Sequence, residues 1–186
     1  MQGGVETEIK LRIADPGSTA AHLRSAGFRE SVTRLFEANT LYDRPDEQLR
    51  NSGTLLRLRQ AGAKNVITWK GPGQPGPHKS RPEVETGIES LDALAQILES
   101  LGYTRTFRYE KYRTEFLRGG EPGVVTLDET PIGNFLELEG PAEWIDRTAS
   151  ELGFSPADYI LDSYGRLYLA DCERRHVQPT HMVFTS

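Results

Sequence analysis

The residues best suited to chemistry are acids and bases that alternate with apolar residues near the start of the chain. In residues 5–13, VETEIKLRI, the carboxylates of Glu6 and Glu8 and the ammonium group of Lys10 share one face of a two-residue repeat. A two-residue repeat is typical of a β-strand, so these groups stand in line on one side of it. In this stretch alone, a solvated face with cross-strand ion pairs is the commoner explanation.

Similar charged faces recur along the chain, and this recurrence favours a shared function. Arg57 and Arg59 lie opposite leucines in residues 54–60, and Glu83 and Glu85 share a face in residues 80–89. Further predicted strands carry charged residues on one face, namely Lys70, Lys111, Arg113, Glu137 and Glu139. Such a set could form one charged surface if the strands belong to one sheet.

The elements that must position these residues follow from periodicity and from turn residues. Strands are predicted at residues 5–13, 32–43, 54–60, 66–70, 80–89, 104–117, 124–128 and 134–140. Helices are predicted after a cap at Ser18, at 45–50, 90–101, 141–152, from 155, and at 163–171. Lys64-Asn65 is the predicted hairpin turn, and residues 71–78 are predicted to form a mobile loop.

These elements predict the α+β class, with a closed eight-stranded antiparallel β-barrel and helices packed on the outside. The helices carry apolar stripes that can cover the apolar faces of the strands. The charged faces would then line the interior and form a tunnel. Buried charge must be paired or bound to something, so this interior calls for ligands.

Composition excludes several classes of function. The chain has 186 residues and a net charge of −5, which indicate one domain that is not a general nucleic-acid binder. No apolar run is long enough for a membrane span or a signal peptide, so a cytoplasmic location and no membrane partner are expected. The single cysteine, Cys172, is predicted to be an ordinary helix residue, and the four histidines have no spacing of a zinc site.

The charged interior predicts metal and phosphate chemistry. Paired carboxylates offer the hard oxygen ligands that Mg²⁺ or Mn²⁺ prefers. Lysine and arginine side chains suit phosphate oxygens. A polyanionic phosphate chain would use both kinds of group, because phosphoryl transfer depends mainly on positioning and charge neutralisation.

The chain resembles the CYTH domain of the triphosphate tunnel metalloenzymes, which include class IV adenylate cyclases, thiamine triphosphatases and inorganic tripolyphosphatases. The resemblance begins with Glu-x-Glu-x-Lys at residues 6–10 and continues in order to about residue 169. Its further motifs are LYD (41–43), LLRLR (55–59), TWKGP (68–72), RPEVET (81–86), EKYRTEF (110–116), LDETPIGNFLELEG (127–140) and SYGRLYL (163–169). It implies a CYTH domain over residues 1–172 and a tail over 173–186, which is expected to be disordered or to contact a neighbour.

The resemblance also implies roles for individual residues. The metal ligands would be Glu6, Glu8, Asp128, Glu137 and Glu139. The triphosphate would be held by Lys10, Arg57, Arg59, Lys70, Lys111 and Arg113. Glu83 and Glu85 would hold a second ion or orient water, and together with Lys111 they form the predicted catalytic set. Arg12 and Glu115 could face the interior or the rim, and Tyr164 is expected to pack a helix.

Three functions follow from this site. The first is a Mg²⁺- or Mn²⁺-dependent hydrolase of a small-molecule triphosphate, with inorganic tripolyphosphate preferred over a nucleoside or thiamine triphosphate. The second is a class IV adenylate cyclase, which converts ATP to cyclic AMP and pyrophosphate. The third is a non-catalytic polyphosphate-binding module. A homodimer is an open alternative for the oligomeric state.

Overall fold

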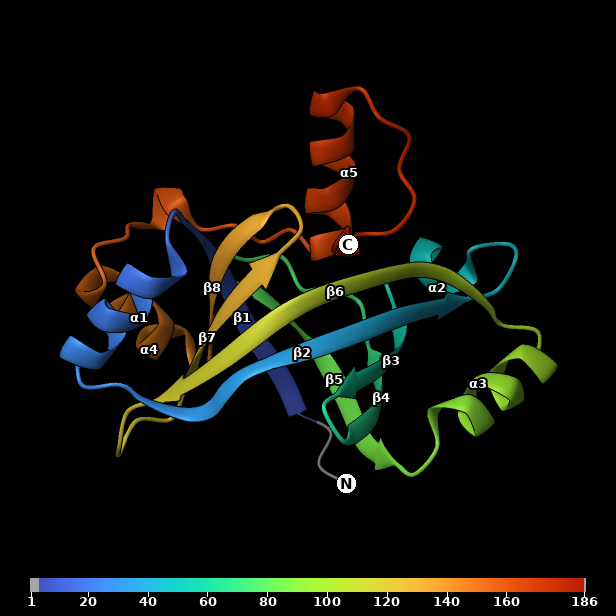
Figure 1. Cartoon of the computed structure of the whole chain (residues 1–186), viewed down its shortest axis with the longest axis horizontal. Coiled ribbons are helices and arrows are strands. Elements are labelled where there is room, and N and C mark those ends of the chain that lie inside the picture. The colour runs from blue at the N-terminus through green and yellow to red at the C-terminus, as the bar shows by residue number, and fades with distance from the viewer. Residues whose placement is uncertain (1–3, 186) are drawn as a thin grey trace.

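The computed structural model describes residues 4–185, and its strands close into one antiparallel barrel (Figure 1). The neighbours around the barrel are β1-β5-β4-β3-β2-β6-β7-β8. The eight strands of the described chain are β1 (Gly4–Ile13), β2 (Arg29–Asp43), β3 (Leu55–Ala61), β4 (Lys64–Lys70), β5 (Lys79–Ile88), β6 (Thr104–Leu117), β7 (Val124–Thr130) and β8 (Gly133–Glu139). The predicted α+β class and closed barrel are therefore confirmed, while residues 1–3 and 186 of the predicted domain and tail lie outside the described residues.

Helices surround the barrel. The described residues form α1 (Pro16–Ser25), α2 (Gln48–Asn51), α3 (Leu91–Ser100), α4 (Ala142–Glu151), the 3₁₀ turn η1 (Pro156–Asp158) and α5 (Tyr164–Arg175). In Figure 1, α1 and α4 lie together at one side of the barrel, α3 lies at the other, and α5 stands beyond one end. No helix within residues 4–185 is both long and apolar enough to cross a membrane.

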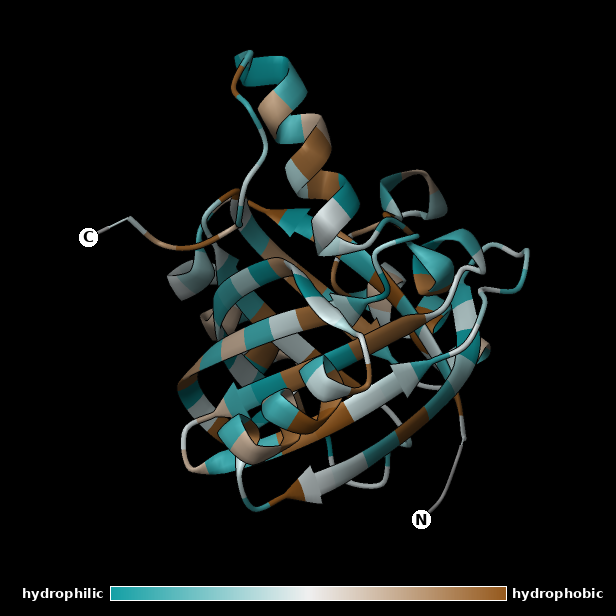
Figure 2. Ribbon diagram, turned by 90° about the vertical axis from the view of Figure 1, so that its right-hand side faces the viewer, coloured by the Kyte–Doolittle hydropathy of each residue, from teal (hydrophilic) through white to brown (hydrophobic). Residues whose placement is uncertain are grey.

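The core lies between the outer face of the barrel and these helices. Ile9 and Leu11 of β1 have no exposed surface, and they belong to a cluster that also contains Leu23 of α1 and Ile145 of α4. Ribbons coloured by hydropathy show the resulting alternation of polar and apolar residues along the strands (Figure 2). A second cluster lies between α3 and the strands β2–β5. The barrel therefore keeps its apolar side outward, as the sequence predicted.

Local capping explains where the helices begin, and it corrects one expectation. The predicted cap of the first helix, Ser18, is wrong, because Asp15 is the N-cap and its Oδ2 accepts a hydrogen bond of 2.6 Å from the Ser18 amide. Ser90 caps α3 as expected, and its hydroxyl oxygen accepts from the Ala93 amide.

The hairpin that joins β3 to β4 turns earlier than predicted. Ala61 pairs with Lys64, so residues 62 and 63 form the turn, and Lys64 and Asn65 belong to β4. Gly62 has a φ of +57°, a backbone conformation that side chains other than glycine rarely adopt. The predicted turn at Lys64-Asn65 is therefore wrong.

The C-terminal segment is ordered and packs on its own barrel. The last helix continues through Arg175, beyond the predicted end at Asp171. Met182 has no exposed surface, its amide donates to the Arg108 carbonyl, and its carbonyl accepts from the Glu110 amide. This segment therefore extends the sheet along β6 at the end where β7 is absent. The expectation of a disordered tail is therefore corrected for the described residues.

Candidate active site

The charged faces of the strands meet inside the barrel. On β1, Glu8 and Lys10 are almost fully buried, while the residues between and after them, Ile9 and Leu11, contact the outer helices. Because neighbouring residues of a strand point to opposite faces, this places the charged series inward. The charged side chains of β1 therefore line the interior of the barrel.

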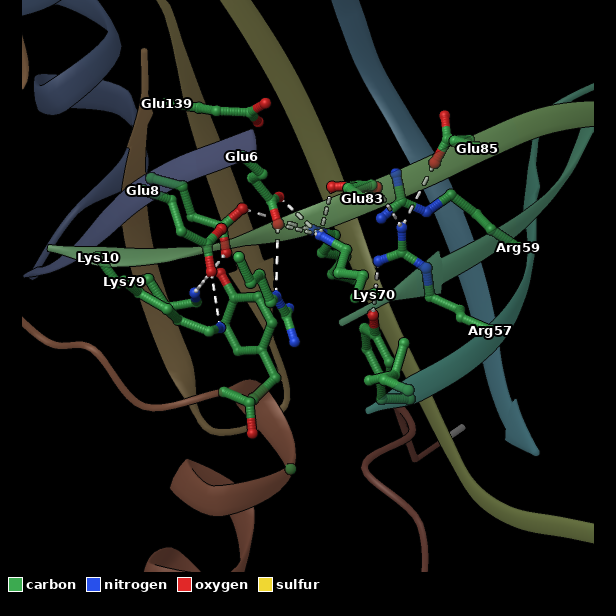
Figure 3. Close-up of a pocket in the computed structure, with 18 of the residues that line it drawn as sticks. Glu6, Glu8, Lys10, Arg57, Arg59, Lys70, Lys79, Glu83, Glu85 and Glu139 are labelled. Atoms are coloured by element: carbon green, nitrogen blue, oxygen red, sulfur yellow. Dashed lines mark hydrogen bonds and ion pairs between the residues drawn. The ribbon is translucent and has the colours of Figure 1, made fainter. Parts of the chain in front are cut away.

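These side chains line a cavity of about 390 Å³, which Figure 3 shows from close by. Its cationic lining residues are Lys10, Arg57, Arg59, Lys70, Lys79, Arg81, Lys111 and Arg113. Its acidic lining residues are Glu6, Glu8, Glu83, Glu85, Glu115, Glu137 and Glu139. The uncharged lining residues are Leu41, Leu55, Tyr109, Ser163, Tyr164 and Gly165. Every predicted site residue except Asp128 therefore lies in the lining of this cavity.

The first group of acids lies where β1 meets β5 and β8. Glu8 stands directly opposite Glu139 in the register of β1 and β8. Burial, together with the carboxylates of Glu6 and Glu8, raises the pKa of Glu139 to about 7. Like charges placed opposite each other repel, so this corner of the cavity favours a cation.

Lysine side chains donate hydrogen bonds to the carboxylates of Glu6 and Glu8. Both carboxylate oxygens of Glu6 accept hydrogen bonds of 2.6 Å from Lys70 Nζ. Glu8 Oε1 accepts from Lys10 Nζ at 3.0 Å and from Lys79 Nζ at 2.7 Å. Within residues 4–185, no three acidic, histidine or cysteine side chains are arranged to hold a metal ion as they stand. The donor set nevertheless fits Mg²⁺ or Mn²⁺, because it supplies hard carboxylate oxygens around a point of mutual repulsion.

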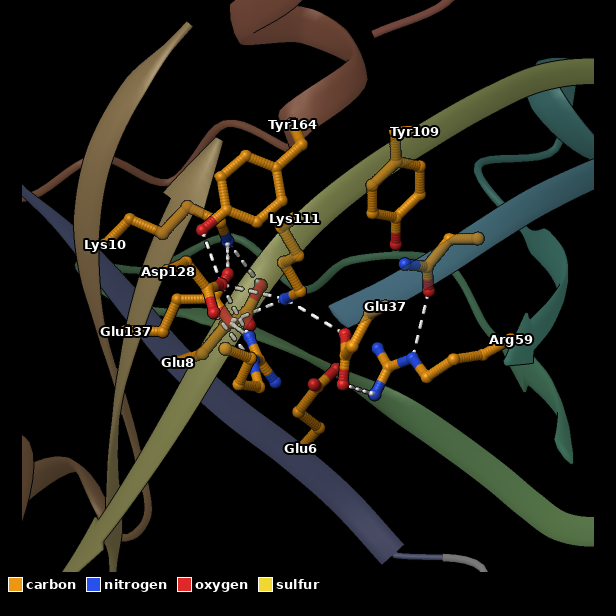
Figure 4. A network of polar contacts seen from close by, with 12 residues as sticks. Glu6, Glu8, Lys10, Glu37, Arg59, Tyr109, Lys111, Asp128, Glu137 and Tyr164 are labelled. Carbon is orange, nitrogen blue, oxygen red and sulfur yellow. Dashed lines mark hydrogen bonds and ion pairs between the residues drawn. The ribbon is translucent and has the colours of Figure 1, made fainter. Parts of the chain in front are cut away.

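The second group centres on Asp128, which is fully buried behind the lining (Figure 4). Its Oδ2 accepts hydrogen bonds from Lys111 Nζ at 2.8 Å, from Arg113 Nη2 at 2.7 Å and from the Tyr164 hydroxyl at 2.7 Å. Its Oδ1 accepts from Arg113 Nε at 2.7 Å. Asp128 thus joins two predicted phosphate-binding residues to the first turn of α5. The neighbouring acid Glu137 contacts Arg113 and lies 3.1 Å from Lys10 Nζ.

The third group lies towards β3, β4 and β5. Arg57 donates to the hydroxyl oxygens of Thr68 at 3.0 Å and Tyr109 at 3.3 Å. Glu83 lies 3.0 Å from Lys70 Nζ, and Glu85 lies 3.5 Å from an Arg57 nitrogen. The Glu85 side chain is 43% exposed, so it stands at an opening of the cavity, while Glu83 lies deeper.

Tyr109 has an unusual electrostatic environment. Burial alone would raise the pKa of its hydroxyl, but Arg57, Arg59 and Lys111 outweigh burial and lower this pKa to about 8. The opposite holds for Tyr164, because burial, Asp128 and Glu137 raise the pKa of its hydroxyl well above the ordinary value. Tyr164 therefore keeps its proton and donates it in the hydrogen bond to Asp128.

Several residues near the cavity were not predicted. Lys79 and Arg81 share the inward face of β5 with Glu83 and Glu85, and that alternation was a usable signal. Tyr109 likewise alternates with Lys111. Glu37 of β2 lies near Arg59 and Lys111, but polar and apolar residues do not alternate regularly along this strand.

Three further expectations can be compared with the structure. For Tyr164 the sequence favours helix packing over a place at the tunnel mouth, whereas the structure places it in the lining of the cavity. Glu115 lies in the lining, whereas Arg12 donates to the Ile132 carbonyl and lies over the Phe135 ring, outside the lining. The sequence left a lumenal or a rim position open for both residues; the structure places Glu115 in the lining and Arg12 outside it.

Comparison with known proteins gives a consistent family. The family model of the CYTH domain matches residues 4–164. A "putative adenylate cyclase" of Methanocaldococcus jannaschii is 29% identical over 136 residues, which make up 73% of this chain and 76% of that protein.

Solved structures share the fold. A "putative adenylate cyclase" of Vibrio parahaemolyticus has a TM-score of 0.78 at 24% identity, over 89% of this chain and 98% of that one. A "putative adenylyl cyclase" of Hippeastrum, described as having a dominant triphosphatase activity, has a TM-score of 0.61 at 16% identity, over 94% of this chain and 97% of that one. At these identities the structural likeness shows the fold alone.

Proposed function

This chain belongs to the CYTH domain family, and we propose that it is a divalent-metal-dependent hydrolase of triphosphates. One observation carries the proposal: a single cavity combines eight cationic side chains with a corner where Glu6, Glu8 and Glu139 converge. The cations match the oxygens of a phosphate chain, and the acids match a metal ion.

Ion pairs inside the cavity support this proposal. The cation Lys70 is bound to Glu6, and Lys10 and Lys79 are bound to Glu8. When a triphosphate takes the lysines as partners, the same carboxylates become free to act as metal ligands. Substrate and metal would therefore replace internal ion pairs with two sets of external ones, and neither charge would be left buried alone.

The predicted residues then have separate tasks. Lys10, Arg57, Arg59, Lys70, Lys111 and Arg113 would bind the phosphate oxygens and hold the chain extended along the cavity. Glu6, Glu8, Glu137 and Glu139 would hold Mg²⁺ or Mn²⁺, which when bound would neutralise phosphate charge and polarise the reacting phosphorus centre. The resemblance places Asp128 among the metal ligands, but among residues 4–185 its carboxylate accepts side-chain hydrogen bonds from two cations and a tyrosine hydroxyl. Asp128 would therefore hold the phosphate-binding groups in position.

Glu83 and Glu85 would orient the attacking water. Burial, which outweighs the opposing effect of Lys70, raises the pKa of Glu83, so this carboxylate is a suitable proton acceptor. The water oxygen would form a bond to phosphorus, its proton would pass to Glu83, and the phosphoanhydride bond would break. The leaving phosphate would keep the bonding electron pair, and Lys111 would stabilise the added negative charge.

A class IV adenylate cyclase is the second candidate, and one feature of the cavity favours it. The uncharged lining residues come from β2, β3, β6 and the start of α5, and they could contact the base of a nucleotide. In that reaction the ribose 3′-hydroxyl would attack the α-phosphorus, and pyrophosphate would leave. The name of the relative from Methanocaldococcus points the same way.

A substrate panel separates these candidates. The full chain is incubated with Mg²⁺ or Mn²⁺ and tripolyphosphate, thiamine triphosphate or ATP, and phosphate, pyrophosphate and cyclic AMP are measured. We expect phosphate from tripolyphosphate, and no release without metal. Cyclic AMP and pyrophosphate from ATP, without phosphate, would identify the cyclase instead. Metal-independent binding without turnover would identify a binding module.

A further inference from the structure

Glu37 is a buried acid on β2 that belongs to none of the motifs and has no place in the proposed reaction. It is 4% exposed and lies beside the predicted phosphate-binding groups. Its Oε1 is 3.6 Å from Arg59 Nη1, and its Oε2 is 3.7 Å from Lys111 Nζ (Figure 4). Glu37 therefore sits directly behind two of the groups expected to hold substrate.

The contacts of Glu37 are electrostatic and do not fix its neighbours in place. Both distances exceed the range of a hydrogen bond, and Oε2 has no hydrogen-bond partner among residues 4–185. Other residues hold the two cations: Asn39 Oδ1 accepts from Arg59 Nε at 2.9 Å, and Asp128 accepts from Lys111 at 2.8 Å. Removing Glu37 would therefore change the local charge more than the local geometry.

Glu37 carries a full negative charge under ordinary conditions. Burial alone would raise the pKa of its carboxyl group, but four cations outweigh burial and lower this pKa to about 2. These cations are Lys111, Arg113, Arg59 and Arg57. Glu37 therefore stays negatively charged, and its charge lies behind the cations that would face bound phosphate.

We propose that Glu37 sets the affinity of the cavity for phosphate groups, because its fixed charge weakens the hold of Arg59 and Lys111 on bound substrate and product. This inference rests on the proposed function, since it concerns the same cavity. Eight lining cations could retain a polyanionic product, and slow product release often limits turnover. A buried counter-charge behind the cations limits their attraction without occupying the cavity.

The expected size of the effect follows from Coulomb's law. A unit charge roughly 7 Å from a phosphate oxygen, at an effective dielectric constant of about 20, changes anion affinity by about 50-fold without screening. At an ionic strength of about 0.1 M, mobile ions roughly halve this interaction energy, so an effect of about tenfold is the expectation.

Two variants that should change the affinity for phosphate groups in opposite directions test the proposal. Glu37→Gln removes the charge and keeps the shape, so tripolyphosphate and pyrophosphate should bind about tenfold more tightly, with a lower KM and stronger product inhibition. Asn39→Asp keeps the acceptor for Arg59 and adds a charge beside it, and both ligands should then bind more weakly. The Nδ2 group of Asn39 has no hydrogen-bond partner among residues 4–185, so this exchange sacrifices no bond. The matched control is Glu30→Gln, at an exposed position of the same strand.

Binding is measured by calorimetry without metal, and turnover is measured separately with Mg²⁺. The difference between Glu37→Gln and the unaltered chain should shrink as ionic strength rises, which a purely geometric role would not produce. Unchanged or weaker binding by Glu37→Gln would overturn the proposal. If that variant does not fold, unchanged or tighter binding by Asn39→Asp would overturn it equally. If no turnover is detected but the two variants change the calorimetric affinity in the expected directions, the hydrolase is rejected and the inference about Glu37 is supported.

Discussion

Replacing Asp128 by asparagine tests whether this residue anchors the predicted phosphate-binding cations in the absence of metal. The variant keeps the shape of the side chain but removes its charge and replaces one acceptor oxygen by a donor. Lys111, Arg113 and Tyr164 all donate to the present carboxylate, so the new amide group would face donors. Breaking a buried charge cluster from one side typically costs about 3–5 kcal/mol.

For Asp128→Asn we expect the lower part of that range, about 3 kcal/mol, because Glu37 and Glu137 still lie within 4.0 Å of Lys111. In a chain of this length, that loss lowers the unfolding temperature by roughly 6–12 °C. Unfolding is followed by circular dichroism during heating and in urea, in a buffer that contains a chelator. A loss of stability under these conditions cannot come from a lost metal ligand.

The adjacent residue supplies the control. Glu129 faces outward from the same strand and pairs with Arg34 at 2.7 Å, where the Arg34 side chain is 52% exposed. An exposed pair of this kind contributes at most about 1 kcal/mol, so Glu129→Gln should have a small effect. If Asp128→Asn lost no more stability than Glu129→Gln, or lost it only in the presence of Mg²⁺, the anchoring role would be refuted.

Three further predictions concern ionisation, metal use and packing. Because Tyr109 has a lowered pKa, its deprotonation should increase the free energy of unfolding as pH rises from about 8 towards 10. This gain should be lost as pH falls through 8. Tyrosinate absorbance that titrates near pH 8 should be absent in Tyr109→Phe. Glu8→Gln should lower metal-dependent kcat by at least about 100-fold while the circular dichroism spectrum stays unchanged. The control Glu30→Gln, at the surface, should keep full activity. Retained activity of Glu8→Gln at saturating Mg²⁺ would count against the role of Glu8 as a metal ligand. Gly123→Ala should cost about 1–3 kcal/mol in urea unfolding, because its new Cβ would clash with the ring of Trp144, the buried tryptophan of α4. Gly119→Ala meets open space and should be nearly neutral, and equal stabilities of the two variants would contradict this packing argument.

The inward face of the strands was predictable because alternation is a property of each strand by itself. The hairpin turn was predicted at Lys64-Asn65 and lies at residues 62–63, yet Arg57 and Lys70 point inward as expected. A wrong turn changes which residues oppose each other, but it does not change the alternation within either strand. The same alternation places Arg81 on the face of Glu83, although no role in the site was predicted for it, and Lys79 lay one residue outside the predicted strand.

The roles of Asp128 and Tyr164 required the structure. Tyr164 belongs to α5, and its side chain reaches Asp128 only because the chain returns across one end of the barrel. Around it, Tyr109 and Phe135 pack within 6.2 Å and 5.5 Å, measured between ring centroids. No local pattern specifies this meeting of a helix start with the interior of a barrel.

Pairing between strands that are not neighbours is the property that the sequence conceals most completely. Lys70 of β4 binds Glu6 of β1 although β5 lies between these strands, because both side chains extend inward over β5. Under the proposed function, each such pair would open before its lysine binds phosphate and its carboxylate binds metal. The affinity of the site would then be the difference between external and internal pairing. A residue such as Glu37, which adds charge without a hydrogen bond, can change that difference while the shape of the cavity stays the same.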